Sequence, residues 1–424
     1  MPVGRIEFAL SKLPVVSRVI ERLDATRVEN ASLRSSLELL RHDPTATAED
    51  WLRKNHAWIL ARAAPAGLSA NGDRRIAMLI SAFNYRSLNN WRPLCDALVQ
   101  KGHAVYTALF PRLSDPDHKG LFDLPYPNLV TAEIDEQFRP IDGDLPGILS
   151  RLREAVVANS IDVIWMSTFH AGPEHHIREA LHDLPRRPVM IGLQHGMAHD
   201  WRRFEEWIDK FDLFGTFGPR FHSRCGDRLR LRMMTCGLPK LDTFPRNKHP
   251  GPIRRILFAA QNEPPLEILK PFLHELSGLT KAEIVVRPHP ECRDVYAGLF
   301  GDFVLDAPDR PIADAFRDVD AVITTGSTAG LESLASGLPT VVLPFCGGEE
   351  YEPAGIVLTK LDAREVIVIF QRFDHADFRA HVASFLDSVA GVAGTRTDLC
   401  VERVEHAASL KHWMEMPLTR LDRG

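Results

Sequence analysis

The fold of this chain is constrained most by a series of short apolar segments that alternate with helical stretches. Ile76–Ile80, Val189–Leu193 and Ile256–Ala260 contain no polar side chain. Runs of this kind are typical of strands that are buried on both faces of a parallel sheet. Since helical stretches lie between most of these runs, the alternation predicts an α/β fold with doubly wound parallel sheets.

The runs fall into two sets, separated by a segment rich in proline, glycine and basic residues at 245–252. We therefore expect two Rossmann-like domains that face one another, the first over 74–245 and the second over 253–375. Helices are expected in an N-terminal extension over 1–70 and again at the C-terminus over 376–424. The other strands are expected at 103–110, 162–166, 283–287, 321–324 and 340–343, and the helices between them at 90–101, 146–159, 175–183, 267–277, 312–316 and 329–336, with irregular structure over 111–147.

The N-terminal extension carries an apolar stripe with heptad spacing between Val16 and Leu40. Two of its members are polar, Thr26 at a d position and Asn30 at an a position. The stripe fits an amphipathic helix that lies on its own domain, which is the interpretation we favour. The alternative is a short coiled coil that forms a homodimer through this helix, because a buried Asn at an a position fixes the register of such a coil.

The charge balance argues against a protein that coats nucleic acid. The chain has 51 basic and 56 acidic side chains and a net charge of −5, whereas such a protein needs a net positive field to collect phosphates. The cysteines contain no C-x-x-C pair. We therefore expect scattered reduced thiols rather than a disulfide framework.

No segment indicates a membrane span or a signal peptide. The chain has no run of about 18 apolar residues, the length that a spanning helix needs, and its N-terminus lacks a continuous apolar core. A cytoplasmic protein is therefore expected. The aromatic and basic stretch at 201–207 suits peripheral contact with the inner face of the plasma membrane, although an ordinary half-buried helix is the favoured interpretation.

Candidate site residues follow the apolar runs, because ligands of open parallel sheets bind beyond the carboxyl ends of the strands. The run Val189–Leu193 is followed by a Gln-His-Gly sequence that places His195 where a general base could act. Arg287 and His289 follow Glu283–Val286. The prolines that alternate with them hold a cation and an imidazole on a rigid turn, which suits a phosphate.

A third run, Ala321–Thr324, is followed by a glycine turn, two hydroxyl residues and a predicted helix. Gly326, Ser327 and Thr328 would place backbone N–H groups and hydroxyls at the start of that helix, where anions bind. Glu332, one turn further along, would accept hydrogen bonds from ribose hydroxyls.

A fourth run, Thr340–Leu343, is followed by an acidic, glycine-rich loop in which Glu349 and Glu350 would contact hydroxyls of the donor group. Each of the four loops alone also fits an ordinary structural role, such as a solvent-exposed turn or a Ser N-cap. The site is favoured because two facing domains of this kind would bring all four strand ends to one cleft.

Five short motifs occur in a recognisable order. They are Gln194-His195-Gly196, Cys236-Gly-Leu-Pro-Lys-Leu-Asp242, Arg287-Pro-His-Pro290, Thr325-Gly-Ser-Thr328 with Glu332, and Gly337-Leu-Pro339. In this order they resemble the bacterial capsule-polysaccharide and CDP-glycerol glycerophosphotransferase-like transferases, which have the GT-B fold. The chain also looks like bacterial sialyl- and Kdo-transferases. Gln194 stands where the teichoic-acid enzymes carry Trp, so a sugar donor is as fitting as glycerol phosphate.

The resemblance implies a metal-independent glycosyltransferase or glycerophosphotransferase of cell-envelope biosynthesis. Such an enzyme moves a group from a CMP-, CDP- or UDP-linked donor to a hydroxyl of a polysaccharide or lipid-linked acceptor, without a bound cofactor. The resemblance implies His195 as the base and places His289, Ser327 and Thr328 on the donor phosphate. With Arg287 and the helix start after Gly326, these groups would stabilise the departing nucleotide.

A bound metal is not expected. The Asp-x-Asp sequences at 115–117, 142–144 and 318–320 do not follow strand ends, where a metal–diphosphate site would need them. A zinc site is also not favoured for the histidine cluster His170, His175, His176 and His182. A helix that binds zinc carries two histidines four residues apart, and no two of these have that spacing.

Two other functions fit the same sequence. A UDP-sugar 2-epimerase-like enzyme would have a similar layout and needs several acid and base groups around the sugar. The side chains that could supply them are His170, Glu174, His175 and His176. A non-catalytic nucleotide-sugar-binding scaffold, dimerised by the N-terminal helix, would bind its ligand without turnover.

Overall fold

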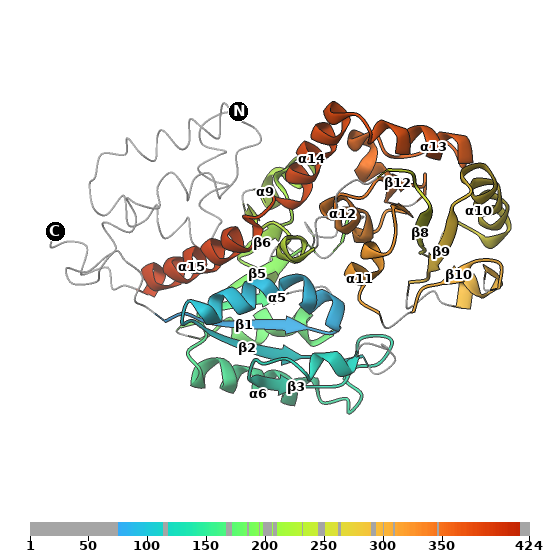
Figure 1. Ribbon diagram of the computed structural model, residues 1–424. Helices are drawn as coiled ribbons and strands as arrows, with labels where there is room; N and C mark the ends of the chain where they lie inside the picture. Colours follow the sequence, from blue (N-terminus) through green and yellow to red (C-terminus); the bar gives the residue numbers. More distant parts are fainter. Residues whose placement is uncertain are drawn as a thin grey trace, which may run out of the picture. The chain divides into compact units, whose positions relative to one another are not determined.

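The computed structural model describes most of the chain between residues 75 and 415 (Figure 1). The described residues are 75–112, 118–166, 172–184, 186–194, 196–197, 206, 210–230, 232–244, 251–261, 264–289, 294–299, 301–307, 310–345 and 347–415. They form two compact units. The first holds the described residues up to Pro239, except Gly196 and Met197, together with those from Thr397 onward. The second holds Gly196, Met197 and the described residues from Lys240 to Arg396. The extension expected over 1–70, with its amphipathic or dimerising helix, lies outside the described residues.

The first unit is built on a seven-stranded parallel sheet with the order β3-β2-β1-β4-β5-β6-β7. Its strands are β1 (Ala77–Ala82), β2 (Ala104–Leu109), β3 (Asn128–Thr131), β4 (Val163–Met166), β5 (Val189–Leu193), β6 (Leu213–Thr216) and β7 (Met233–Thr235). Its helices are α5 (Tyr85–Gln100), α6 (Leu145–Ala158), α7 (Ile177–Leu181), α9 (Asp227–Arg230) and α15 (Arg396–Glu415). The strand order changes direction between β1 and β4, as in a Rossmann fold.

The second unit is built on a five-stranded parallel sheet with the order β10-β9-β8-β11-β12. Its strands are β8 (Arg255–Ala259), β9 (Glu283–Arg287), β10 (Val304–Leu305), β11 (Ala321–Thr324) and β12 (Thr340–Val342). Its helices are α10 (Leu266–Thr280), α11 (Ile312–Arg317), α12 (Thr328–Ala335), α13 (Ala363–Arg372) and α14 (Ala376–Ala390). Here the order changes direction between β8 and β11, which is the switch point where ligands of such sheets bind.

The predicted α/β fold with two Rossmann-like sheets is confirmed. The apolar runs became the central strands, and every residue of β1, β4, β5 and β11 is buried. The strands that the sequence did not predict are short or lie at the edge of a sheet, where the apolar pattern is broken. β3 falls within 111–147, which was expected to be irregular, and its outer residues are exposed. Both residues of β10 are also exposed.

Three aspartates fix the register of the central strands. Each stands directly before a strand and accepts a backbone N–H from the start of the strand beside it. The bonds run from Ala77 to Asp162 (3.0 Å), from Met190 to Asp212 (3.0 Å) and from Arg255 to Asp320 (2.9 Å). A shift of one residue would separate each N–H from its carboxylate and move the side chains of the strand to the opposite face, so these bonds oppose slippage.

The two ends of the second unit are joined to each other by hydrogen bonds. Asp242, close to its start, lies 3.0 Å from the guanidinium of Arg396, its last residue. The same carboxylate accepts the N–H of Gly394 at 2.9 Å. The side chain of Arg396 is only 2% exposed, so this contact belongs to the interior.

The described cysteines Cys95, Cys225, Cys236 and Cys400 are buried thiols that form no disulfide. Cys292 and Cys346 lie outside the described residues. None of the helices that the structure describes combines the length and the apolar character required to cross a bilayer.

Asp212 makes the stability of the first unit dependent on pH. Burial by itself would raise the pKa of this carboxyl, but hydrogen bonds from Arg187, the charges of Arg187 and Arg178, and the N–H of Met190 hold it below its ordinary value of 3.8. Arg187 lies at 2.6 and 2.7 Å and Arg178 at 3.0 Å. A lowered folded-state pKa adds stability above the unfolded pKa, and this contribution is lost as the pH falls through the folded value.

We therefore expect the free energy of unfolding, measured by urea denaturation, to fall as the pH is lowered from about 6 to about 3. Asp212→Asn should lower stability at the higher pH and reduce this pH dependence, because the titrating carboxylate is gone. Asp123→Asn, at an exposed carboxylate, is the matched control and should change neither. An unaltered pH dependence in Asp212→Asn would contradict the assignment.

Candidate functional site

Hydrogen bonds join the carboxyl ends of β8, β9 and β11 around the switch point of the second unit. The N–H of His289 donates to the carbonyl of Ala260 at 3.0 Å, and the N–H of Ala260 donates to the carbonyl of Arg287 at 2.9 Å. The hydroxyl of Thr324 donates to the carbonyl of Ala259 at 3.2 Å. The loops that follow these strands therefore leave the sheet from fixed, neighbouring positions.

The start of α12 is shaped by Ser327, which is its N-cap. The Oγ of Ser327 accepts the N–H of Ala329 at 3.2 Å, and its carbonyl accepts the N–H of Gly330 at 3.1 Å. Within the described part of the chain, the N–H of Thr328, the first helical residue, has no acceptor. A hydroxyl that accepts a hydrogen bond still has its own hydrogen to donate. Capping and anion binding are thus compatible at Ser327.

Glu332 lies buried one turn into α12 and is paired with Lys240. The Nζ of Lys240 is 2.6 Å from Oε1 of Glu332, and the two side chains are 17% and 5% exposed. Lys240 also lies 5.7 Å from the centre of the Phe244 ring. It was not predicted as a site residue, although it stands in the Cys236–Asp242 motif. The pair fixes the Glu332 carboxylate, whose Oε2 forms no hydrogen bond with the described residues.

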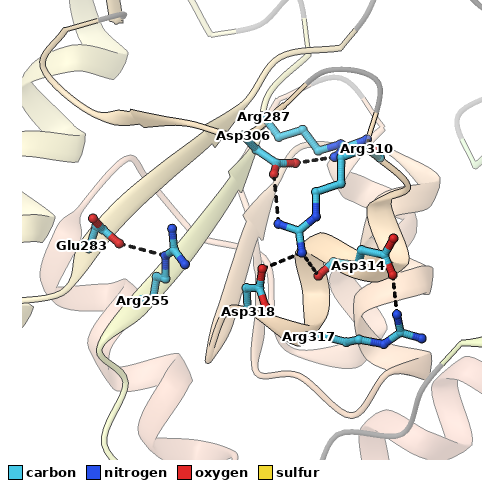
Figure 2. A network of polar contacts seen from close by, with 8 residues as sticks. All are labelled: Arg255, Glu283, Arg287, Asp306, Arg310, Asp314, Arg317 and Asp318. Carbon is cyan, nitrogen blue, oxygen red and sulfur yellow. Dashed lines mark hydrogen bonds and ion pairs between the residues drawn. The ribbon is translucent and has the colours of Figure 1, made fainter.

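Arg287 is part of a network of charged side chains, which Figure 2 shows from close by. Its guanidinium pairs with Asp306 and donates to the carbonyl of Arg310. Arg310 in turn lies 3.5 Å from Asp306 and 2.5 Å from Asp318. The network ties the end of β9 to the loop after β10 and to α11, so Arg287 could contact a phosphate only by sharing its guanidinium with these partners.

The other predicted residues of the second unit lie in the loops after β9, β11 and β12. His289, Gly326 and Thr328 are half-buried. Glu349 is exposed, whereas Glu350 is 5% exposed. Of these two carboxylates, only that of Glu349 is open to a donor hydroxyl.

In the first unit, the residue before the predicted base is described in detail. Gln194 is fully buried, its N–H donates to the carbonyl of Gly215 at 2.9 Å, and its side-chain oxygen accepts the N–H of Phe217 at 3.0 Å. These bonds tie the end of β5 to the end of β6. His195 itself lies outside the described residues, so its role as a base stays a prediction. The segment at 245–250 and residues 201–205 also lie outside the described residues.

The histidines of the epimerase interpretation lie near α7. The rings of His175 and His176 are 5.3 Å apart, and Glu174 is buried. The pKa of His175 is lowered, first by burial and then by the charges of Lys210 and His176. His170 lies outside the described residues. In the part of the chain that is described, no three His, Cys, Asp or Glu side chains are grouped so as to hold a metal.

No family model and no curated protein matches the sequence of this chain. Solved structures match its fold. Staphylococcus aureus MnaA in complex with UDP has a TM-score of 0.55 and 13% identity, over 79% of this chain and 97% of that one. A glycosyltransferase from Rickettsia africae has a TM-score of 0.53 and 10% identity, over 80% and 99%. The UDP-GlcNAc 2-epimerase of Neisseria meningitidis bound to UDP-GlcNAc has a TM-score of 0.51 and 12% identity, over 78% and 99%.

These similarities establish the fold. The match extends over nearly the whole length of each known structure, so both units of this chain take part in it. The chain therefore has the GT-B fold that the motifs predicted. The likeness to the capsule and CDP-glycerol enzymes within that fold stays a prediction.

The contact between Lys240 and Glu332 leads to a prediction about stability. Lys240→Ala would leave the carboxylate of Glu332 buried without its cation, and we expect the free energy of unfolding to fall by about 3 kcal/mol. Glu332→Gln removes the charge, so the double variant should regain part of this loss. Urea denaturation of the four proteins measures the coupling. Strictly additive losses would show that the pair does not interact.

Proposed function

We propose that this GT-B chain is a metal-independent transferase that uses a nucleotide-activated donor. It would move a sugar or a glycerophosphate group to a hydroxyl of a polysaccharide or glycolipid precursor of the cell envelope. The second unit would bind the donor nucleotide, and His195 of the first unit would act on the acceptor.

The observation that carries the proposal is the arrangement at the start of α12. The helix begins directly after a central strand of the switch point, with two hydroxyl residues in its first turn and a fixed carboxylate at Glu332. The positive end of a helix dipole with N–H and hydroxyl donors binds phosphate, and a carboxylate one turn away can accept from a ribose. Two of the similar structures hold UDP or UDP-GlcNAc, which supports a nucleotide ligand for this fold.

The proposed reaction is a direct displacement. The acceptor hydroxyl gives its proton to the imidazole of His195 while its oxygen forms a bond to the activated carbon or phosphorus of the donor. The bond from that atom to the leaving nucleotide breaks, and the electron pair departs on a phosphate oxygen. His289, Ser327 and Thr328 would donate hydrogen bonds to that oxygen and its neighbours. Arg287 would add positive charge from the turn that carries His289.

A UDP-sugar 2-epimerase-like reaction is the second candidate. It is favoured by the adjacent rings of His175 and His176, which could serve as acid and base, and by the likeness of the fold to known epimerases. The two functions differ in what they need. An epimerase converts a UDP-sugar in the absence of any acceptor, whereas a transferase leaves it unchanged apart from slow hydrolysis.

Nucleotide binding is tested by the melting temperature. We expect one of CMP, CDP, UDP, GDP or ADP, at millimolar concentration, to raise the melting temperature of the protein, because a ligand that binds only the folded state stabilises it. His289→Ala should remove most of this shift. His274→Ala, at a surface histidine that lies 3.1 Å from Asp302, is the control and should keep it. If none of the nucleotides raises the melting temperature, the proposal fails.

Catalysis is tested at His195. In a transfer assay with the donor that the melting experiment selects, His195→Ala should lower kcat by about 10²- to 10⁴-fold, the usual contribution of a general base. The affinity for the nucleotide should stay within twofold of the original, because the imidazole is assigned to the acceptor. A variant that keeps its kcat would exclude His195 as the base, and one that loses nucleotide binding would place this residue at the donor instead.

A further inference from the structure

Tyr351 connects the loop after β12 to the start of α12. It lies in the 3₁₀ segment Gly348–Ala354, and its side chain is fully buried. Its hydroxyl donates to the carbonyl of Ser327 at 2.5 Å. The N-cap residue of α12 is therefore held by a side chain from another loop as well as by its own helix.

The Tyr351 hydroxyl packs so closely against α12 that a side chain at Gly330 would collide with it. A Cβ at Gly330 would lie 2.8 Å from the Tyr351 hydroxyl oxygen and 2.9 Å from the ring carbon that carries it. On its other side, the tyrosine ring lies 5.9 Å from the ring of Phe385 in α14. α12 thus has a glycine where the tyrosine approaches it, and the tyrosine is fixed between two helices.

The bond to the Ser327 carbonyl also orients the N–H of Thr328. A trans peptide is planar, and its C=O and N–H point in opposite directions. Ser327 and Thr328 share one peptide, and Tyr351 binds its oxygen. The N–H of Thr328, on the opposite side of this peptide, therefore points away from Tyr351. That N–H is the first donor of α12, and it has no acceptor among the described residues.

We infer that Tyr351 is a positioning residue for the donor phosphate, which it influences through the Ser327–Thr328 peptide without touching the ligand. The inference rests on the proposed function, since it assumes that the start of α12 binds a phosphate. It assigns a role to the loop after β12 that differs from the one predicted for Glu349 and Glu350. The loop would fix the donor groups of the neighbouring loop, in addition to any contact that its carboxylates make.

Burial keeps the hydroxyl of Tyr351 protonated, as its role as a hydrogen-bond donor requires. Its pKa is raised well above the ordinary value of 10, chiefly by burial. The hydroxyl therefore keeps its proton around neutral pH, and phosphate affinity should not titrate there with this residue.

The test compares Tyr351→Phe with the original protein, using inorganic pyrophosphate as a probe that is independent of the nucleotide base. We expect calorimetry to show a dissociation constant about three- to tenfold higher in the variant, the effect of losing one hydrogen bond. Hydrogen exchange at Ala329 and Gly330, whose N–H groups donate to Ser327, should become faster by a similar factor. Tyr126→Phe is the matched control, because it removes another tyrosine hydroxyl bond, 2.5 Å long, to Asp96 in the first unit. It should change neither measurement.

Gly330→Ala disturbs the same contact from the helix side and should give the same two changes. Pyrophosphate affinity equal to that of the original protein in both variants would overturn the inference, as would unchanged exchange at the start of α12. If the original protein itself does not bind pyrophosphate, the proposed function is contradicted. Hydrogen exchange then tests separately whether Tyr351 positions the peptide, and unchanged exchange in the variants would contradict that role.

Discussion

The structure depends on the carboxylates that stand at the amino ends of the central strands. Asp162, Asp212 and Asp320 each accept an N–H from the strand alongside, in both sheets and at equivalent positions. A parallel sheet has no tight turns to set its register, because its strands are joined by long crossovers. A carboxylate that accepts an N–H at the start of the neighbouring strand supplies that information. Once the register is set at the amino ends, the positions of the carboxyl ends of the strands relative to one another are set as well.

At those opposite ends, the second unit gathers groups of complementary chemistry. The register of β8 and β9 places the loop of His289 next to Ala260, and the register of β8 and β11 sets the point from which α12 leaves the sheet. α12 then carries hydroxyl donors in its first turn and a carboxylate one turn later. Lys240 holds the carboxylate, Tyr351 holds the first peptide, and Arg287 is held by Asp306. The candidate site is thus preorganised by contacts between its residues and other side chains of the same unit.

The sequence predicted what depends on local pattern. Apolar runs revealed the buried central strands and therefore the loops that follow them. Edge strands such as β3 and β10 were not predicted, because one side of such a strand faces solvent and the apolar run is lost. The contacts that support the site were not predicted for a different reason. Lys240 and Glu332 are 92 residues apart in the chain and Tyr351 and Ser327 are 24 apart, and no periodicity in one sequence brings such pairs together.

The hydrogen bonds between Asp242 and the 394–396 turn have a consequence for how such a protein can be modified. They close the stretch from Lys240 to Arg396, because Asp242 near its start is bonded to Gly394 and Arg396 at its end, while the remaining chain continues before and after it. An insert of this kind can be exchanged as a cassette, since cutting at two adjacent points removes a complete sheet with its helices and leaves termini that lie close together. Under the proposed function, donor preference would then change by replacement of one contiguous stretch of sequence, while the part of the chain assigned to the acceptor is inherited intact.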